Sequence, residues 1–155
     1  MIDDFFNKEF WVVDFLPKQV PEKAGGRFFS VEEYYLEPTR YAVMRERFSD
    51  ILLKLYCYYD LQLLVDDDTE GLAHPDPELL ASHIKDNQGD LRILIGASEG
   101  LISLSRDDTH MTVYAPSEDL FELIRMLADA VGLFVWKANQ DCHSIRFEQE
   151  LKKDE

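Results

Sequence analysis

The densest group of chemically active side chains lies in the stretch VDDDTEGLAHPDPE, residues 65–78. It holds six carboxylates and no Lys or Arg, and Asp66, Asp67, Asp68 and Glu70 fall within five positions. Clustered carboxylates can coordinate a divalent cation, attract a basic protein, or keep a loop hydrated. These three alternatives belong to different classes of function, so the surrounding sequence must decide between them.

The calcium hypothesis depends on spacing. Asp66, Asp68 and Glu70 alternate, and Gly71 takes the sixth position, as in the first half of an EF-hand loop. The twelfth position should carry a bidentate glutamate, but Pro77 stands there instead. Half a motif favours a solvated loop between two helices, with a divalent-metal site in the 66–78 loop as the alternative.

The pentapeptide GASEG, residues 96–100, matches the G-x-S-x-G pattern around the nucleophile of serine hydrolases. That pattern works where a strand turns sharply into a helix and lifts the serine onto the helix N-terminus. The residues that follow, LISLS, have the composition of a strand. Ser98 is therefore predicted to lie in a hairpin turn and to have no catalytic role.

Histidine and cysteine offer no recognisable constellation. Cys142 and His143 are adjacent, so their side chains point apart on a strand or a helix and cannot activate each other directly. The other histidines show no zinc-ligand spacing, and no cofactor is predicted. A small enzyme whose site is assembled only by the fold remains an alternative, with His110 near the carboxylates of Asp107 and Asp108.

Tyrosines are concentrated around the C-terminal end of the most strongly periodic helix. Tyr56, Tyr58 and Tyr59 cannot all face one core, so some of these rings should be partly exposed. Tyrosine combines a large apolar face with a polar tip and suits protein interfaces. The alternative is that the rings cover the sheet.

Charge excludes several classes of partner. The 155 residues include 31 acidic and 16 basic side chains, giving a net charge of −15. Such a surface repels nucleic-acid phosphates and anionic lipids, so neither nucleic acid nor a membrane is expected as a partner. The N-terminus does not resemble a signal peptide, and the two cysteines form no CxxC motif. A cytoplasmic protein with reduced thiols is expected.

These side chains must be positioned by a single α+β domain spanning 1–155, with an antiparallel meander of about four to five strands packed against two to four helices. Strand patterns cover 9–16, 91–97, 100–105, 110–115 and 133–138. Helical stripes cover 41–59, 77–89 and 118–131, and a shorter helix should start at 30. Residues 17–27 are predicted as an exposed loop, and 148–155 as a frayed tail.

Local signals define the ends of these helices. Ser30 and Glu33 fit a capping box, Asp76 precedes a proline at a favoured first helical position, and Ser117 fits an N-cap. Gly132 suits a left-handed helix end.

The sequence thus favours a non-catalytic protein-binding module. An immunity or inhibitor protein for a basic partner, such as a cationic toxin or nuclease, belongs to this class. Electrostatic complementarity raises the association rate and selects the partner without any chemistry. The candidate partner-binding residues are Asp66, Asp67, Asp68, Glu70, Tyr56 and Tyr59. A metal-binding domain through Asp66, Asp68 and Glu70 and a small enzyme are the alternatives, and the sequence indicates no oligomeric state.

Overall fold

The computed structural model describes residues 2–138 and folds that range into one α+β domain built on a seven-stranded antiparallel sheet. The strands are β1 Phe10–Asp14, β2 Leu61–Val65, β3 Leu72–Ala73, β4 Leu91–Ile95, β5 Gly100–Leu104, β6 His110–Tyr114 and β7 Phe134–Ala138. The helices are η1 Ile2–Asn7, η2 Glu22–Ala24, α1 Gly25–Tyr35, α2 Pro38–Leu55, α3 Pro77–Asp86 and α4 Glu118–Ala130, where η marks a 3₁₀ helix. The predicted fold class is confirmed, and the strand number exceeds the predicted four to five.

The sheet order is β3-β2-β4-β5-β6-β1-β7. Strands β4, β5 and β6 form the predicted meander, because only short turns separate them. Strand β1 comes first in the chain but lies inside the sheet. Asp14 pairs with His110 of β6 on one side and with Phe134 of β7 on the other.

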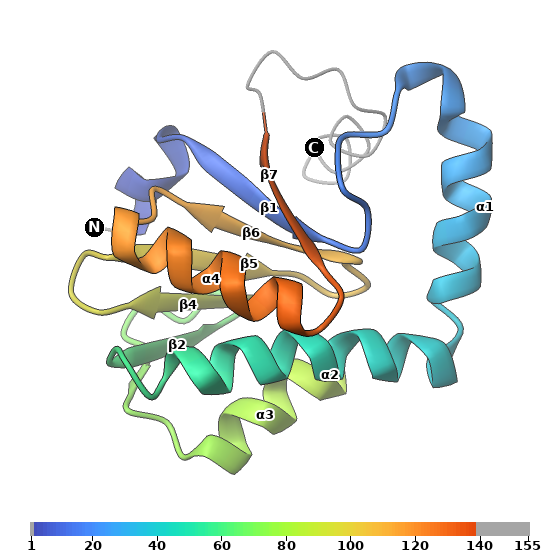
Figure 1. Cartoon of the computed structure of the whole chain (residues 1–155). Helices are drawn as coiled ribbons and strands as arrows, with labels where there is room; N and C mark the ends of the chain where they lie inside the picture. Colours follow the sequence, from blue (N-terminus) through green and yellow to red (C-terminus); the bar gives the residue numbers. More distant parts are fainter. Residues whose placement is uncertain (1, 139–155) are drawn as a thin grey trace.

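Helices α2, α3 and α4 cover one face of the sheet, while α1 stands to the side (Figure 1). We call this the helix face. Alternate strand residues meet the helices in one core that includes Phe48, Leu52 and Leu55 of α2, Leu80 of α3, Ile124 of α4, and Leu63, Ile93, Ile102 and Val113 of the strands. The opposite, second face carries η1, whose Phe5 packs on Leu94 and Leu101.

The predicted helix ends are largely confirmed. The Asp76 carboxylate accepts a hydrogen bond from the Glu78 amide at 2.9 Å, and the Ser117 hydroxyl accepts one from the Leu120 amide at 3.2 Å. Gly132 follows α4 with φ +79°, a conformation that costs glycine little. Local side-chain chemistry therefore fixes where α3 and α4 begin and where the chain leaves α4.

The predicted loop over 17–27 is wrong in its second half. Helix η2 occupies Glu22–Ala24, and α1 begins directly afterwards at Gly25. The predicted capping box fails with it, because Ser30 lies inside α1 and its hydroxyl donates to the Gly26 carbonyl at 3.1 Å. Two adjacent glycines disfavour a helix intrinsically, yet α1 begins with Gly25 and Gly26, and its buried residues are Gly25 and Phe28.

The acidic stretch does not join two helices as predicted. It leaves β2, turns, and returns as the two-residue strand β3 at the edge of the sheet. The Gln62 and Leu63 backbones pair with Ala73 and Leu72. The carboxylates therefore lie on and around the β2–β3 hairpin at the edge of the sheet.

Two sequence predictions concern the chain ends or a membrane. Within the described range, no helix combines the length and apolar character that a membrane span requires. The predicted frayed tail at 148–155 lies outside the described residues, as does the Cys142–His143 pair.

Candidate functional site

The outer edge of the sheet and the segments next to it form an acidic surface that we call the acidic edge. Residues 55–84 contain seven carboxylates and no Lys or Arg. All seven are exposed: Asp60, Asp66, Asp67, Asp68, Glu70, Asp76 and Glu78. They run from the start of β2, around the hairpin, to the start of α3, so they follow a strand of about 17 Å at roughly 3.4 Å per residue.

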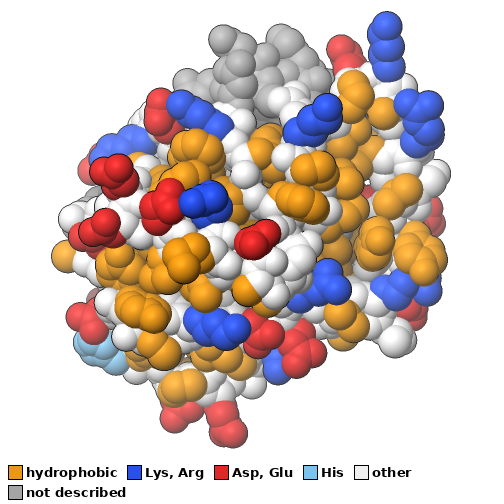
Figure 2. Space-filling view, in the orientation of Figure 1, with side chains coloured by type: hydrophobic (Ala, Val, Ile, Leu, Met, Phe, Trp, Pro, Cys, Tyr) orange, Lys and Arg blue, Asp and Glu red, His pale blue; other side chains and the backbone are white. Residues whose placement is uncertain are grey.

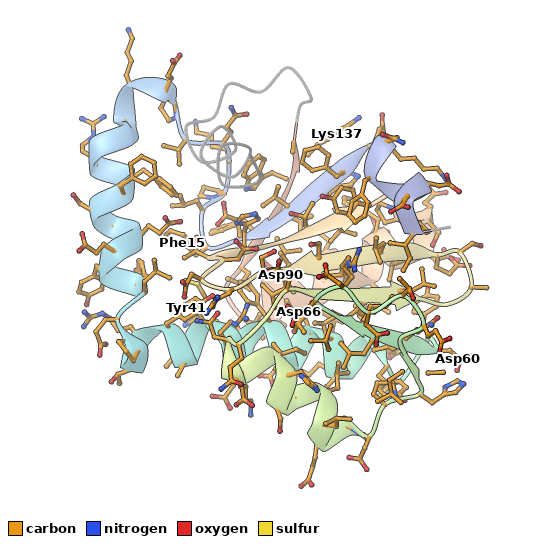
Figure 3. The ribbon with its side chains drawn as sticks, turned by 180° about the vertical axis from the view of Figure 1, so that it is seen from behind. Phe15, Tyr41, Asp60, Asp66, Asp90 and Lys137 are labelled. Carbon is orange, nitrogen blue, oxygen red and sulfur yellow. The ribbon has the colours of Figure 1, made fainter. Side chains whose placement is uncertain are left out.

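Some of these carboxylates build the loops that present the others. Asp66, with φ +53°, accepts a hydrogen bond through Oδ1 from the Asp90 amide at 3.0 Å. Its backbone carbonyl accepts a second one from Arg92 Nη2 at 2.8 Å. Figure 3 shows Asp66 and Asp90 close together, with Asp60 farther along the edge. Asp66 therefore ties the hairpin to the loop before β4.

Asp68 and Asp76 are also partly engaged by the backbone. Asp68 Oδ1 accepts from the Glu70 amide at 3.2 Å, and Asp76 caps α3. Asp67, Glu70 and Glu78 make no side-chain hydrogen bond or ion pair with residues 2–138, so their carboxylates stand in solvent. These three are the acids most available to a partner.

The metal hypothesis gains no support from this geometry. Among residues 2–138, no three side chains of His, Cys, Asp or Glu converge closely enough to hold a metal ion. Asp66 and Asp68 instead accept amide hydrogen bonds. The hypothesis stays a prediction.

The predicted aromatic residues are only partly available. Tyr56 is half-buried, and its hydroxyl donates to the Pro75 carbonyl at 2.9 Å, which holds the segment before α3 against the end of α2. Tyr59 packs against the core, and burial together with the nearby Glu99 raises the pKa of its hydroxyl. Tyr58 is the exposed ring of the group, at 68%.

Two apolar side chains join Tyr58 on the segments that bear the acids. Leu72 of β3 is 46% exposed and Leu79 of α3 is 40% exposed. The helix-covered side differs, because Lys and Arg are interspersed there with Asp and Glu around the apolar side chains (Figure 2). The acidic edge thus combines predominantly negative charge with exposed apolar contact area.

The enzyme hypothesis placed His110 near Asp107 and Asp108, but the structure gives those two carboxylates other partners. Asp107 Oδ1 accepts from Asn87 Nδ2, and Asp108 Oδ2 accepts from the Ser105 amide, both at 2.8 Å. These bonds shape the turn between β5 and β6. His110 instead lies on the second face of the sheet, beside Asp14 of the neighbouring strand.

Asp14 is a residue that the sequence analysis missed. It is 0% exposed and accepts a hydrogen bond from Trp136 Nε1 at 3.3 Å, while His110 is 2% exposed. Phe10, Val12 and Asp14 share one face of β1, so a carboxylate in the alternating pattern was the available signal. Asp14 and His110 are therefore buried polar side chains on neighbouring strands of the second face.

A second buried polar group lies under the helix face. Arg45 of α2 is 0% exposed; its Nη1 donates to the Ser105 carbonyl at 3.3 Å, and its guanidinium lies 5.5 Å from the centre of the Tyr41 ring. The Tyr41 hydroxyl donates to the Asp108 carbonyl at 2.6 Å. Arg45 and Tyr41 therefore anchor the β5–β6 turn to α2. Burial lowers the pKa of Arg45 and raises that of Tyr41.

Comparisons with known proteins leave this surface to be interpreted by its own chemistry. No family model matches the chain, and neither a curated protein nor a solved structure is significantly similar to it.

Proposed function

We propose that this chain is a non-catalytic protein-binding module that receives a basic partner protein on the acidic edge. The observation that carries the proposal is the run of thirty residues, 55–84, whose seven exposed carboxylates face no Lys or Arg of their own segment. Uniform charge on a surface steers an oppositely charged protein and can raise its association rate by one to three orders of magnitude.

Exposed apolar side chains supply the stability of the complex that charge alone does not provide. Interface stability comes mainly from a few desolvated apolar or aromatic anchors, while rim charges govern rate and selection. Tyr58, Leu72 and Leu79 lie on the same segments as the carboxylates and can serve as such anchors. An inhibitor or immunity protein for a cationic toxin or nuclease fits this combination. The exposed Cys57 thiol fits a reducing compartment such as the cytoplasm.

A peptide-display selection against the immobilised chain tests the proposal. We expect the selected peptides to be rich in Lys and Arg and to bind more weakly as salt concentration rises. The edge variant carries Asp67→Asn, Glu70→Gln and Glu78→Gln, which touch no hydrogen bond between side chains. With each exposed pair worth about 0.2–1 kcal/mol, affinity should fall by roughly 3- to 150-fold.

A matched control variant distinguishes an effect of the acidic edge from an effect of the net charge. Glu22→Gln, Glu33→Gln and Glu46→Gln change three exposed acids elsewhere, so both variants shift the formal charge from −15 to −12. Wild-type affinity in the control supports the edge. Equal loss in both variants, or selected peptides without basic residues, would overturn the proposal.

A further inference from the structure

A hollow of about 280 Å³ opens on the second face of the sheet, between η1 and the β2–β3 hairpin. Its lining comes from three segments distant in sequence: Ile2 and Asp3 of η1, Gln62 and Leu64 of β2, Asp68 and Thr69 of the hairpin, and Arg92 and Leu94 of β4. The hollow adjoins the acidic edge, because Asp68 belongs to both.

The sheet supplies the base of the hollow. Gln62 pairs with Leu94 and Leu64 pairs with Arg92, so these four side chains form a square on one face with the two leucines on one diagonal. Leu64 and Leu94 are 1% and 4% exposed. The base is therefore close-packed, and only a small part of these two leucines faces the hollow. Ile2 of η1 adds a half-buried apolar side chain to the lining.

The polar side chains of the lining differ in how far their hydrogen-bonding capacity is used. Arg92 donates to the Asp66 carbonyl, and the Gln62 amide donates to the Glu70 carbonyl, so both serve the hairpin backbone. Asp68 uses one oxygen, Oδ1, to accept from the Glu70 amide. Asp3 makes no hydrogen bond or ion pair with the described residues. The unused charged acceptors of the lining are thus the carboxylate oxygens of Asp3 and Asp68, while Arg92, Gln62 and Thr69 keep polar groups of their own.

The formal charge of the lining also favours a cationic ligand. Two carboxylates, Asp3 and Asp68, face one guanidinium, Arg92, and the lining has a formal charge of −1. A single incoming cation would make it neutral. Lys and Arg side chains combine an aliphatic stem with a charged donor head, and they bury the stem while the head stays near water.

From these observations we propose that the hollow receives one Lys or Arg side chain of the basic partner. The stem lies over the leucine base and against Ile2, and the head donates hydrogen bonds to the carboxylates of Asp3 and Asp68. The inference rests on the proposed function and names the point on the surface where that partner is anchored.

Nuclear magnetic resonance titration with Nα-acetyl-arginine amide tests this site directly. The matched control ligand is Nα-acetyl-citrulline amide, which has the same shape without the charge. We expect saturable shifts at the Thr69 and Leu94 amides with the arginine compound alone. Asp3→Asn combined with Asp68→Asn should weaken that binding by roughly tenfold, since two exposed charge contacts are lost. Glu22→Gln with Glu33→Gln should leave it unchanged.

Two results would overturn the inference: equal binding of the citrulline compound at these amides, or arginine-dependent shifts confined to other regions. The peptides selected on the acidic edge distinguish this failure from that of the proposed function. If the edge variant weakens them and the Asp3/Asp68 variant does not, the module binds basic partners without using the hollow. If neither variant affects them, both proposals fail.

Discussion

Replacing the buried Arg45 of α2 by methionine should leave the protein as stable as before or make it more stable. Methionine keeps the length and apolar character of the side chain and removes the guanidinium. The wild-type guanidinium is fully buried, yet Nε and Nη2 have no hydrogen-bond partner among the described residues. A buried charge with incomplete hydrogen bonding is often replaced by an apolar side chain without loss of stability.

The contributions of Arg45 to the free energy of unfolding can be compared one by one. The variant loses the bond from Nη1 to the Ser105 carbonyl, worth about 1.5–3 kcal/mol for a charged donor. It relieves two unpartnered donors, each costing about 1–3 kcal/mol. The attraction to Asp107 and Asp108 is screened by solvent and adds less than about 1 kcal/mol to the loss. We expect the free energy of unfolding to rise by between zero and about 2 kcal/mol.

Urea unfolding followed by the fluorescence of Trp11 and Trp136 measures the change. Arg45→Ala is the comparison, because it removes the same charge and also leaves a cavity. It should be less stable than Arg45→Met by about 2–5 kcal/mol. A fall of more than about 3 kcal/mol in Arg45→Met would refute the reasoning, since only a well-paired buried charge is worth that much.

Three further predictions concern packing, pH and metal. Gly100→Ala should lower the melting temperature by roughly 3–10 °C, because the new Cβ would lie 2.7 Å from Cδ2 of Leu120 in α4. In the control Gly26→Ala, the new Cβ meets nothing within 4 Å, so the melting temperature should not fall. Burial raises the pKa of Tyr41 above its unfolded value of about 10, so its contribution is present below pH 10 and is lost as pH rises further; the fall in stability above pH 10 should be shallower in Tyr41→Phe, as measured by urea midpoints across pH. Calcium titration should produce no saturable rise in the melting temperature, and a rise abolished by Asp68→Asn would instead establish a metal site in the acidic loop.

The helices and the meander could be predicted because their signals are local. The apolar stripe of α2 repeats over five turns, and the caps of α3 and α4 are set by residues two or three positions away. Strand β2 was missed because LQLLV is a short apolar run directly after a helical stripe, and periodicity does not distinguish the two.

The exposure of the acidic stretch was also foreseeable. Which of its carboxylates accept backbone hydrogen bonds and which stand in solvent was not. Asp66 stabilises a loop through the Asp90 amide, twenty-four positions away, and no local pattern encodes that distance. The same holds for the hollow, which brings Asp3 to Asp68 and Arg92 only after the sheet has formed. Asp14 and Arg45 became visible as buried polar residues only through tertiary packing.

The position of β1 inside the sheet has a consequence for biosynthesis. Its neighbours β6 and β7 begin at His110 and Phe134, so Asp14 must wait for at least ninety-six further residues before its first partner exists. At about 5–20 residues per second, that delay is about 5–20 s on the ribosome. During this time the apolar segment FWVVD has both backbone edges unpaired, which makes it a natural target for chaperones or for aggregation.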